Sequence, residues 1–343
     1  MKVGFKRERD KRERWMPVMH GLAMMHGMDF FNFAEDNVDL ENQTILGEYW
    51  DVGKGDFVEK LTPFSEIDII SDSRTWKDFG VRDQLRQAGI ITTWVNLGGK
   101  TKVSRILQGT PLSGSFTQTY QMKDIAILEM IEKYGEIVVK PDDSSFGRGV
   151  RKISRLGPLF RLQLGDKTET LTMEQLLEKE REFKQQKFIL QEYVHSRTLA
   201  GNPFDIRVYM MRGGENGDGK WVGLTPIPRI GNAGGLVSNT GVGGNANFYP
   251  VNFLKSEFGG AWQGIYEDIS RLAYTLPRVL QRYYKSPLTM LGLDIGIDRR
   301  THQLKLFEVN GSVHRTQYKA ELCQNHINIW KFLYNRADSA RLL

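Results

Sequence analysis

The chain has 343 residues, too many for one ordinary hydrophobic core and enough for two or three subdomains. Hydrophobic residues make up 40% and charged residues 26% of the sequence, a mixture typical of folded globular proteins. No run of about 18 apolar residues is present, and the charged N-terminus lacks the apolar core of a secretion signal. We therefore expect neither a membrane span nor export.

The net charge is +6 and the isoelectric point is near 9.2. Such a balance can indicate nucleic acid, a membrane surface or anionic substrates, but acidic and basic residues interleave along this chain. The segment 6–14 alternates in sign, and we interpret it as a solvated helical turn or tail. A single cysteine, Cys323, excludes an intramolecular disulfide and favours a packed side chain in a reducing cytoplasm.

Residues 1–98 are expected to contain the basic N-terminal segment followed by a small α/β domain. The segment "EIDIISDSR" (66–74) has the pattern of a buried strand. The next segment, 81–90, predicts a helix closed by Gly89, and the strand-like "IITTWVNL" follows. The order strand, helix, strand favours an α/β arrangement.

Residues 99–187 are expected to form a second unit. A short helix carrying Val103, Ile106 and Leu107 ends near Gly109. An amphipathic helix over 124–135 then leads into the strand "EIVVKP", and a glycine-rich turn, the strand "RKISRL" and the helix "LTMEQLLEKEREFKQQ" complete the unit.

Residues 188–343 are richer in β signals and open with the strand "FILQEYV". The segments "FDIRVYMMRG" and "KWVGLTPIPRIG" flank "GENGDG", which predicts a hairpin. A helix, "EDISRLAYTLPRVLQRYY", is expected to bend near Pro277. The final predicted strands lie in "MLGLDIGIDRRTHQLKLFEVNGS", on either side of a turn at 299–302.

A lysine and a glycine-rich turn form the first candidate site. Lys140 stands at the end of the apolar strand, where it can project toward a ligand at the sheet edge. Small residues in the following turn let backbone N–H groups approach an anion, although an ordinary hairpin turn fits the same pattern. These residues are Ser144, Ser145, Gly147 and Gly149.

Acidic and amide side chains form the second candidate site. Glu308 and Asn310 are two residues apart in a strand and share one face, and Asp294 on the adjacent predicted strand can meet them across the ladder. Oxygen ligands of this kind suit Mg²⁺. A solvent-facing polar edge is the alternative, but both strands are otherwise strongly apolar, and buried carboxylates need a cation. A third pair, Asp205 and Arg207, shares a strand face and is compatible with phosphate binding or with a surface ion pair.

The order of these motifs resembles the ATP-grasp superfamily and looks closest to its YheC/YheD type, which is spore-coat-associated. The resemblance covers roughly residues 100–312 and rests on "VVKP", the glycine turn, "LQEYV", "FDIRV", "RIGNAGGLVSNTGVGG", "GLDIGID" and "FEVNGS". It implies an α+β fold in which two lobes clasp ATP, preceded by a small α/β pre-ATP-grasp domain.

The resemblance also implies roles for single residues. Lys102 and Lys140 would contact the ATP phosphates, and the turn from Ser144 to Gly149 would cover them as a lid. Adenine would meet a hinge formed by Glu192, Tyr193 and Val194, while Asp205 would hold the ribose. Catalytic contacts to the phosphates or to an acyl-phosphate would come from Arg207, Arg229 and Asn239. Mg²⁺ would be held by Asp294, Glu308 and Asn310.

Two departures from the family pattern affect these expectations. The metal strand continues as "VNGSVHRTQY" instead of the usual proline-containing "N-x-x-P-G" run, which leaves the neighbouring substrate contacts open. The link "HSRTLAGNP" between hinge and ribose strand is unusually long, which weakens the assignment of Asp205.

The activity implied is ADP-forming ligation of a small-molecule or peptide carboxylate to an amine or related nucleophile, through an acyl-phosphate, in the cytoplasm or in association with spores. The competing interpretations are an ATP-binding structural protein with little turnover and, from the charge alone, a nucleic-acid-binding protein. A P-loop is disfavoured because "GGKT" (98–101) has Trp94 where that motif requires glycine. "FGRG" lacks the third glycine of a dinucleotide site, and the scattered histidines lack metal-ligand spacing.

Overall fold

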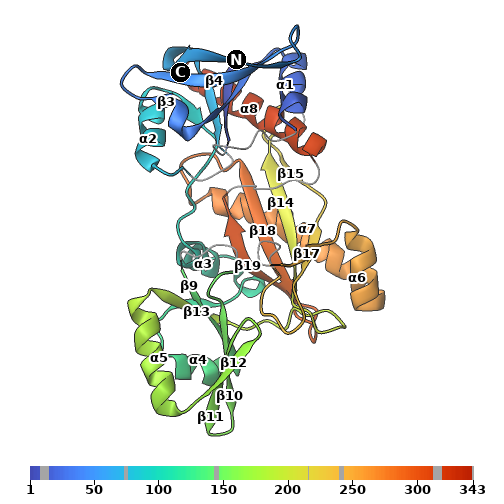
Figure 1. The fold of residues 1–343 in the computed structure, drawn as a ribbon. Helices are drawn as coiled ribbons and strands as arrows, with labels where there is room; N and C mark the ends of the chain where they lie inside the picture. Colours follow the sequence, from blue (N-terminus) through green and yellow to red (C-terminus); the bar gives the residue numbers. More distant parts are fainter. Residues whose placement is uncertain are drawn as a thin grey trace.

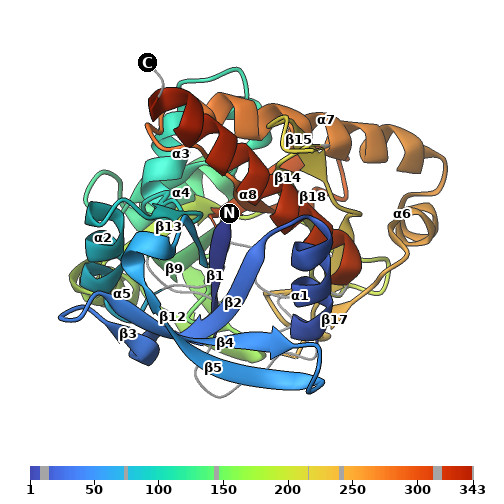
Figure 2. The ribbon, with the colours of Figure 1, turned by 90° about the horizontal axis from the view of Figure 1, so that it is seen from above.

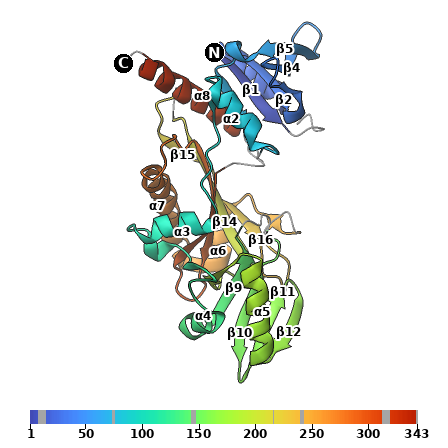
Figure 3. The ribbon, with the colours of Figure 1, turned by 90° about the vertical axis from the view of Figure 1, so that its left-hand side faces the viewer.

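Three sheets, stacked along the long axis of the molecule, organise the chain (Figures 1 and 3). The structure, a computed structural model, describes residues 1–7, 15–72, 76–142, 147–214, 216–238, 243–311 and 319–341. The N-terminal domain lies at one end, a sheet backed by α4 (Ile127–Tyr134) and α5 (Met173–Gln185) lies at the other, and a large central sheet lies between them. The predicted α+β architecture is confirmed.

The N-terminal sheet has the strand order β3-β4-β2-β1-β6-β7, and β5 pairs with β4. Its central strand β1 runs parallel to β2 on one side and to β6 on the other. Two helices, α1 (Met16–Met25) and α2 (Phe79–Gln87), connect parallel strands, as an α/β domain requires. The strands are β1 (Lys2–Arg7), β2 (Asp29–Ala34), β3 (Val38–Asp39), β4 (Thr44–Asp51), β5 (Asp56–Pro63), β6 (Ile69–Asp72) and β7 (Ile91–Thr92).

The interpretation of segment 6–14 as a solvated turn or tail is wrong for its first two residues. Lys6 and Arg7 complete β1, and Lys6 is only 5% exposed. The Lys6 ammonium lies 3.4 Å from Glu35, and Arg7 Nη2 donates to Glu48 at 3.0 Å. These cations are held inside the domain by carboxylates distant in sequence, because a buried charge needs a partner. Residues 8–14 lie outside the described part of the chain.

The C-terminal helix α8 (Lys319–Arg341) packs against the N-terminal domain. Viewed from above, it runs beside β1 and α1 (Figure 2). Its buried Ile327, Trp330 and Leu333 join Val3 and Phe5 of β1 in one apolar cluster. A second contact ties the helix to the central sheet, where the Asn328 amide donates to Gly214 O at 2.6 Å. The first and last parts of the chain therefore share a core.

The sheet at the opposite end has the order β12-β11-β10-β9-β13-β8. Thr172 caps α5 by accepting from the backbone N–H of Gln175, whose side chain bonds back to Thr172 N. Ile137 and Val139 of β9 face α4 and α5 in a core, which leaves the alternate residues of β9 on the opposite face. The strands are β8 (Thr119–Gln121), β9 (Glu136–Pro141), β10 (Arg151–Leu156), β11 (Leu159–Leu164), β12 (Lys167–Leu171) and β13 (Phe188–Glu192).

The central sheet has the order β17-β16-β14-β18-β19, and β15 pairs with β14. Its apolar face packs against α3 (Lys100–Gln108), α6 (Pro250–Phe258) and α7 (Trp262–Gln281) in the largest core cluster. The predicted hairpin around "GENGDG" is present as β14 and β15. The strands are β14 (Phe204–Arg212), β15 (Trp221–Gly223), β16 (Ile227–Ile230), β17 (Asn245–Ala246), β18 (Met290–Ile297) and β19 (Leu304–Asn310).

The expected division of the chain at residue 188 does not follow these sheets. Strand β13 pairs with β9, so it belongs to the same lobe as the residues before 188. Helix α8 packs on the N-terminal domain as well as on β14 of the central sheet, so it does not belong to the second lobe alone. The boundary between the two lobes is better placed after β13, where the chain crosses to β14.

Candidate nucleotide and metal site

A pocket lies between the β9–β13 sheet and the central sheet. It encloses about 910 Å³ of space, including the part that is open to solvent. Residues from both lobes line it, so that side chains far apart in sequence meet in one place. Those named in the sequence analysis are Lys140, Gly147, Glu192, Tyr193, Val194, Asp205, Arg229, Asp294 and Glu308.

Lys140 projects into the pocket from the end of β9. Strand alternation places Val138 and Lys140 on the pocket face, opposite the core residues Ile137 and Val139. The side chain is buried, and burial lowers the pKa of Lys140 to about 8, although Glu308 works against this shift. Among the described residues no carboxylate contacts the Lys140 ammonium directly, so an anionic ligand would stabilise its charged form.

Two glycines of the turn after β9 have the backbone conformation that favours glycine. Gly147 and Gly149 have φ values of +71° and +73°, which side-chain-bearing residues rarely adopt. A Cβ on Gly147 would also come within 3.0 Å of Val237, so this turn touches the loop after β16. Ser144 and Ser145, predicted in the same turn, lie outside the described residues.

The structure places Lys100, and not Lys102, among the pocket residues. Lys100 Nζ donates to Asp142 O at 2.9 Å and lies 3.8 Å from Glu308 Oε1. Lys102 is exposed, and its ammonium lies 5.1 Å from the centre of the Tyr284 ring. Because α3 begins at Lys100, residues two apart leave the helix in different directions.

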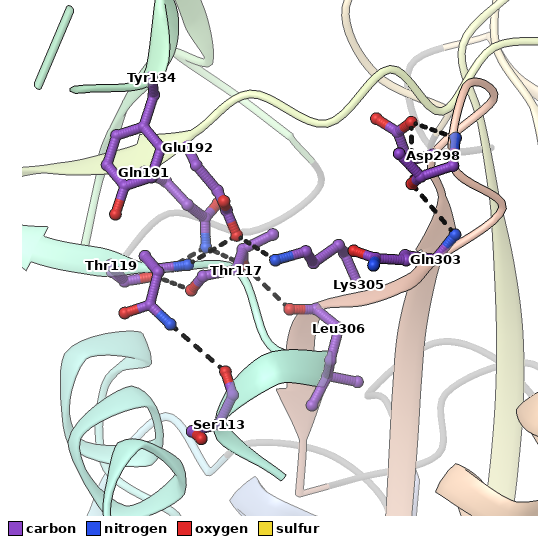
Figure 4. A network of polar contacts seen from close by, with 12 residues as sticks. Ser113, Thr117, Thr119, Tyr134, Gln191, Glu192, Asp298, Gln303, Lys305 and Leu306 are labelled. Carbon is purple, nitrogen blue, oxygen red and sulfur yellow. Dashed lines mark hydrogen bonds and ion pairs between the residues drawn. The ribbon is translucent and has the colours of Figure 1, made fainter. Parts of the chain in front are cut away.

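The segment Glu192, Tyr193 and Val194, for which an adenine hinge is predicted, leads from β13 of the first lobe toward β14 of the second. Glu192 Oε1 accepts from Lys305 Nζ at 2.9 Å and from Gln118 N at 3.1 Å, as Figure 4 shows in part. Its carboxylate therefore joins the first lobe to β19. Tyr193 N donates to Glu136 O at 3.2 Å, so the hinge backbone is fixed to β9.

A second polar connection runs beside the hinge (Figure 4). Thr117 donates to Leu306 O through its backbone N–H at 3.2 Å and through its hydroxyl at 2.9 Å. The Gln191 amide reaches the hydroxyls of Thr117 and Thr119 at 2.6 and 2.8 Å. Buried polar groups that are fully bonded in this way fix the geometry between the lobes.

Two arginines and two aspartates form a buried cluster on the pocket face of the central sheet. Arg229 donates to both oxygens of Asp205, at 2.7 and 2.5 Å, and to Asp294 at 2.9 Å. Arg207 forms a two-pronged pair with the same Asp294 carboxylate. Burial alone would raise the pKa of Asp294, but the two arginines hold it below its usual range.

The structure assigns Asp205 a contact that the sequence analysis did not expect. Its carboxylate, predicted to hold the ribose, is bound at both oxygens by Arg229 and is 5% exposed. The Asp205–Arg229 pair lies at the pocket wall. Asn239, the third predicted catalytic residue, lies outside the described residues, and its neighbour Ser238 lines the pocket.

Glu308, Asn310 and Asp294 share one face of adjacent strands, as predicted. Asp294 lies opposite Glu308 in the ladder, and Asn310 lies opposite Gly292. Glu308 is half-buried, and burial raises its pKa, so a bound cation would stabilise its charged form. The donors are all oxygens, which suits Mg²⁺.

Asp294 is the member of this set whose oxygens are already engaged, by Arg207 and Arg229. Within the described ranges no three histidine, cysteine or acidic side chains group as metal ligands. The candidate magnesium ligands are therefore the carboxylates of Asp294 and Glu308 and the amide of Asn310. Of these three, Glu308 and Asn310 do not belong to the arginine–aspartate cluster.

Apolar residues that the sequence analysis missed make up a large part of the remaining pocket wall. Val138 and Val150 come from the first lobe, Leu236 and Val237 from the loop after β16, and Phe307 from β19. The sequence does not distinguish these apolar residues from the residues of a hydrophobic core, whereas the polar residues of the site stand in recognisable motifs. A pocket that combines apolar side chains with convergent polar groups is typical of small-molecule sites.

A family model describing YheC/D-like ATP-grasp proteins matches residues 91–335. The chain belongs to the YheC/D-like ATP-grasp family. The predicted resemblance is thereby confirmed over most of the chain. Among curated proteins no sequence matches this ATP-grasp chain.

Solved structures with the same fold include the D-alanine–D-alanine ligase of Bacillus anthracis. It is 11% identical, with a TM-score of 0.54 and coverage of 98% of this chain and 99% of that one. D-alanyl-alanine synthetase A of Vibrio cholerae is 14% identical, with a TM-score of 0.51 and coverage of 95% and 93%. The macrocyclase MdnC of Microcystis aeruginosa, bound with precursor peptide MdnA, is 11% identical, with a TM-score of 0.52 and coverage of 96% and 99%.

These likenesses support the ATP-grasp fold over nearly the whole chain, including residues 1–90, which the family model does not reach. In the part of the chain that the structure describes, no helix has the length and apolarity of a membrane span.

Proposed function

We propose that this ATP-grasp protein is an ADP-forming ligase that binds ATP in the pocket between its lobes and activates a carboxylate. One observation carries the proposal: Lys140 from β9 and Glu308 from β19 face a single pocket, although they lie in different sheets. The solved ligases with the same fold add support, since two of them are named for joining alanines.

The triphosphate would lie beside the charged side chains of the pocket. Lys140 and Lys100 both line the pocket, and so does Gly147 of the glycine-rich turn. Arg229 and Arg207 are held rigidly by their aspartates, so they would offer N–H donors in fixed positions to a phosphate at little entropic cost. The base would lie among the apolar side chains, beside the hinge.

A magnesium ion would be held by Glu308 and Asn310, with Asp294 sharing oxygens that also bind arginine. When bound, such an ion neutralises phosphate charge. Asp205, in this proposal, positions Arg229 and contacts nucleotide only through the exposed edge of the pair.

The proposed reaction has two steps. An oxygen of the substrate carboxylate attacks the γ-phosphorus of ATP, the bond to the β-phosphate oxygen breaks, and ADP leaves. An amine nitrogen then attacks the acyl carbon, phosphate leaves with the bonding electrons, and the nitrogen loses a proton. Fixed cations stabilise the charge at both steps, and closure between the lobes excludes water from the acyl-phosphate.

The test is a screen of the full chain with Mg-ATP and pools of amino acids and short peptides. ADP release should depend on an acid–amine pair, and the product mass should equal the sum of the two substrates less one water. Glu308→Gln, which keeps the side chain's shape, should bind Mg-ATP weakly and release no ADP. Tight ATP binding without ADP release across the pools would instead favour a structural ATP-binding protein, and no ATP binding would refute the proposal.

A further inference from the structure

The strand that carries Glu308 contains a β-bulge at the pocket. Asp294 pairs with Glu308 and Ile295 pairs with Leu306, so Phe307 has no partner on β18. Regular alternation would send Phe307 and Glu308 to opposite faces of the sheet. Because the bulge inserts one residue, both side chains line the same pocket.

Gly296 on β18 provides the space for the Phe307 ring. A Cβ built on Gly296 would lie 2.0 Å from Phe307 Cζ and 2.7 Å from both Cε atoms. No side chain tolerates such distances, so the edge of the ring rests directly on the glycine backbone. The φ value of Gly296 is one that other residues adopt readily, so position 296 requires glycine only because Phe307 leaves no space for a side chain.

Neighbouring residues leave the ring little freedom to move away. Lys305, which flanks Phe307 on β19, is held by Glu192 of the hinge at 2.9 Å. Leu306 O accepts two hydrogen bonds from Thr117 of the first lobe. The backbone on one side of Phe307 is thus anchored to the opposite lobe, and on the other side Glu308 is paired with Asp294.

We infer that Gly296 is a positioning residue for nucleotide binding, which seats the Phe307 ring so that it forms the floor under the nucleotide base. The inference rests on the proposed function, because it needs ATP in this pocket. The bulge sets the base-facing ring and the metal-facing carboxylate side by side, and the glycine fixes the depth of the ring. A methyl group at position 296 pushes the ring into the space that the base would occupy.

The experiment measures binding of Mg-ATP and of magnesium tripolyphosphate to the full chain by calorimetry. Base–aromatic contact depends on the ring position, so Gly296→Ala should weaken Mg-ATP binding by roughly tenfold. Tripolyphosphate has no base, and its affinity should not change. A general loss of structure would lower both affinities together, so the ratio separates the two causes.

A compensating change tests the link to Phe307. In the double variant Gly296→Ala with Phe307→Leu, the smaller side chain leaves room for the methyl group, and ATP affinity should return to that of Phe307→Leu alone. Gly264→Ala in α7 is the matched control, because a Cβ there meets no atom within 4 Å. That control should bind both ligands as the unmodified chain does.

Several results would overturn the inference. Unchanged ATP affinity in Gly296→Ala, an equal loss for both ligands, or a double variant that recovers nothing each excludes a role through the ring. If Gly296→Ala is insoluble, a soluble double variant with the affinity of Phe307→Leu supports the inference, and an equally insoluble one refutes it. An unmodified chain that binds neither ligand refutes the proposed function itself.

Discussion

Acidification should destabilise the N-terminal domain through two buried histidines. His20 and His326 are 3% and 1% exposed and lie against the aromatic rings of Phe30, Phe5 and Trp330. Burial lowers the pKa of each to about 4, from an ordinary value of 6.5. Each imidazole is therefore neutral in the folded domain under conditions in which the unfolded chain would protonate it.

The sign and size of the effect follow from proton linkage. Near pH 5 the unfolded state binds more protons than the folded state, so the free energy of unfolding falls as pH falls through about 6.5. Between about pH 7.5 and pH 5 the loss is roughly 2 kcal/mol per histidine. Since the two sites are in one domain, the combined loss is about 4 kcal/mol, a large part of the stability of a typical domain.

Urea unfolding at several pH values, followed by tryptophan fluorescence, measures this loss because Trp330 lies in the same cluster. The double variant His20→Gln with His326→Gln cannot titrate at these positions. It should lose most of the pH dependence, even if its stability at neutral pH is lower. Carboxylates with shifted pKa values act equally in both proteins and cancel. An identical pH slope in the variant and the unmodified chain would refute the reasoning.

Three further predictions concern the pocket. Lys140→Met should weaken binding of magnesium tripolyphosphate as strongly as binding of Mg-ATP, because the lost charge faces phosphate and not the base. Calorimetry measures both affinities, and a loss of affinity for Mg-ATP alone would contradict the prediction. Glu308→Gln should raise the Mg²⁺ concentration needed for ATP binding by about 100-fold or more, judged from the 10–100-fold effects of more distant partners; a magnesium titration at fixed ATP measures it. Arg229→Met should lower the free energy of unfolding by about 3–5 kcal/mol, because Asp205 then stays buried without a cation. In urea unfolding, the double variant Arg229→Met with Asp205→Leu should lose less stability than Arg229→Met alone. Equal losses of stability in the two variants would exclude the buried carboxylate as the cause.

The local sequence pattern is sufficient to predict the strands that carry the polar site residues and the face on which each residue lies. In "EIVVKP" the alternation of apolar positions places Lys140 opposite Val139, and the structure has that arrangement. The same rule places Glu308 and Asn310 on one face. Period-two alternation is set by residues within one strand, so a single sequence displays it.

Features that depend on pairing between distant segments could not be predicted in this way. The bulge at Phe307 exists only in the register between β18 and β19, and no property of either strand alone reveals it. Lys6 and Arg7 resemble a solvated segment until Glu35 and Glu48 are brought beside them by the fold. The family resemblance implies Lys102, whereas Lys100 lines the pocket, because the sequence alone does not show which side of the first turn of α3 faces it.

The packing of α8 on the first domain has a consequence for how the protein is made. A ribosome releases β1 long before α8, yet Val3 and Trp330 belong to one apolar cluster. The N-terminal domain must wait, with part of one sheet face uncovered, until α8 emerges. During that interval the exposed apolar surface of the nascent sheet is a substrate for chaperones. Translation that stops before α8 leaves an N-terminal domain that lacks part of its hydrophobic core.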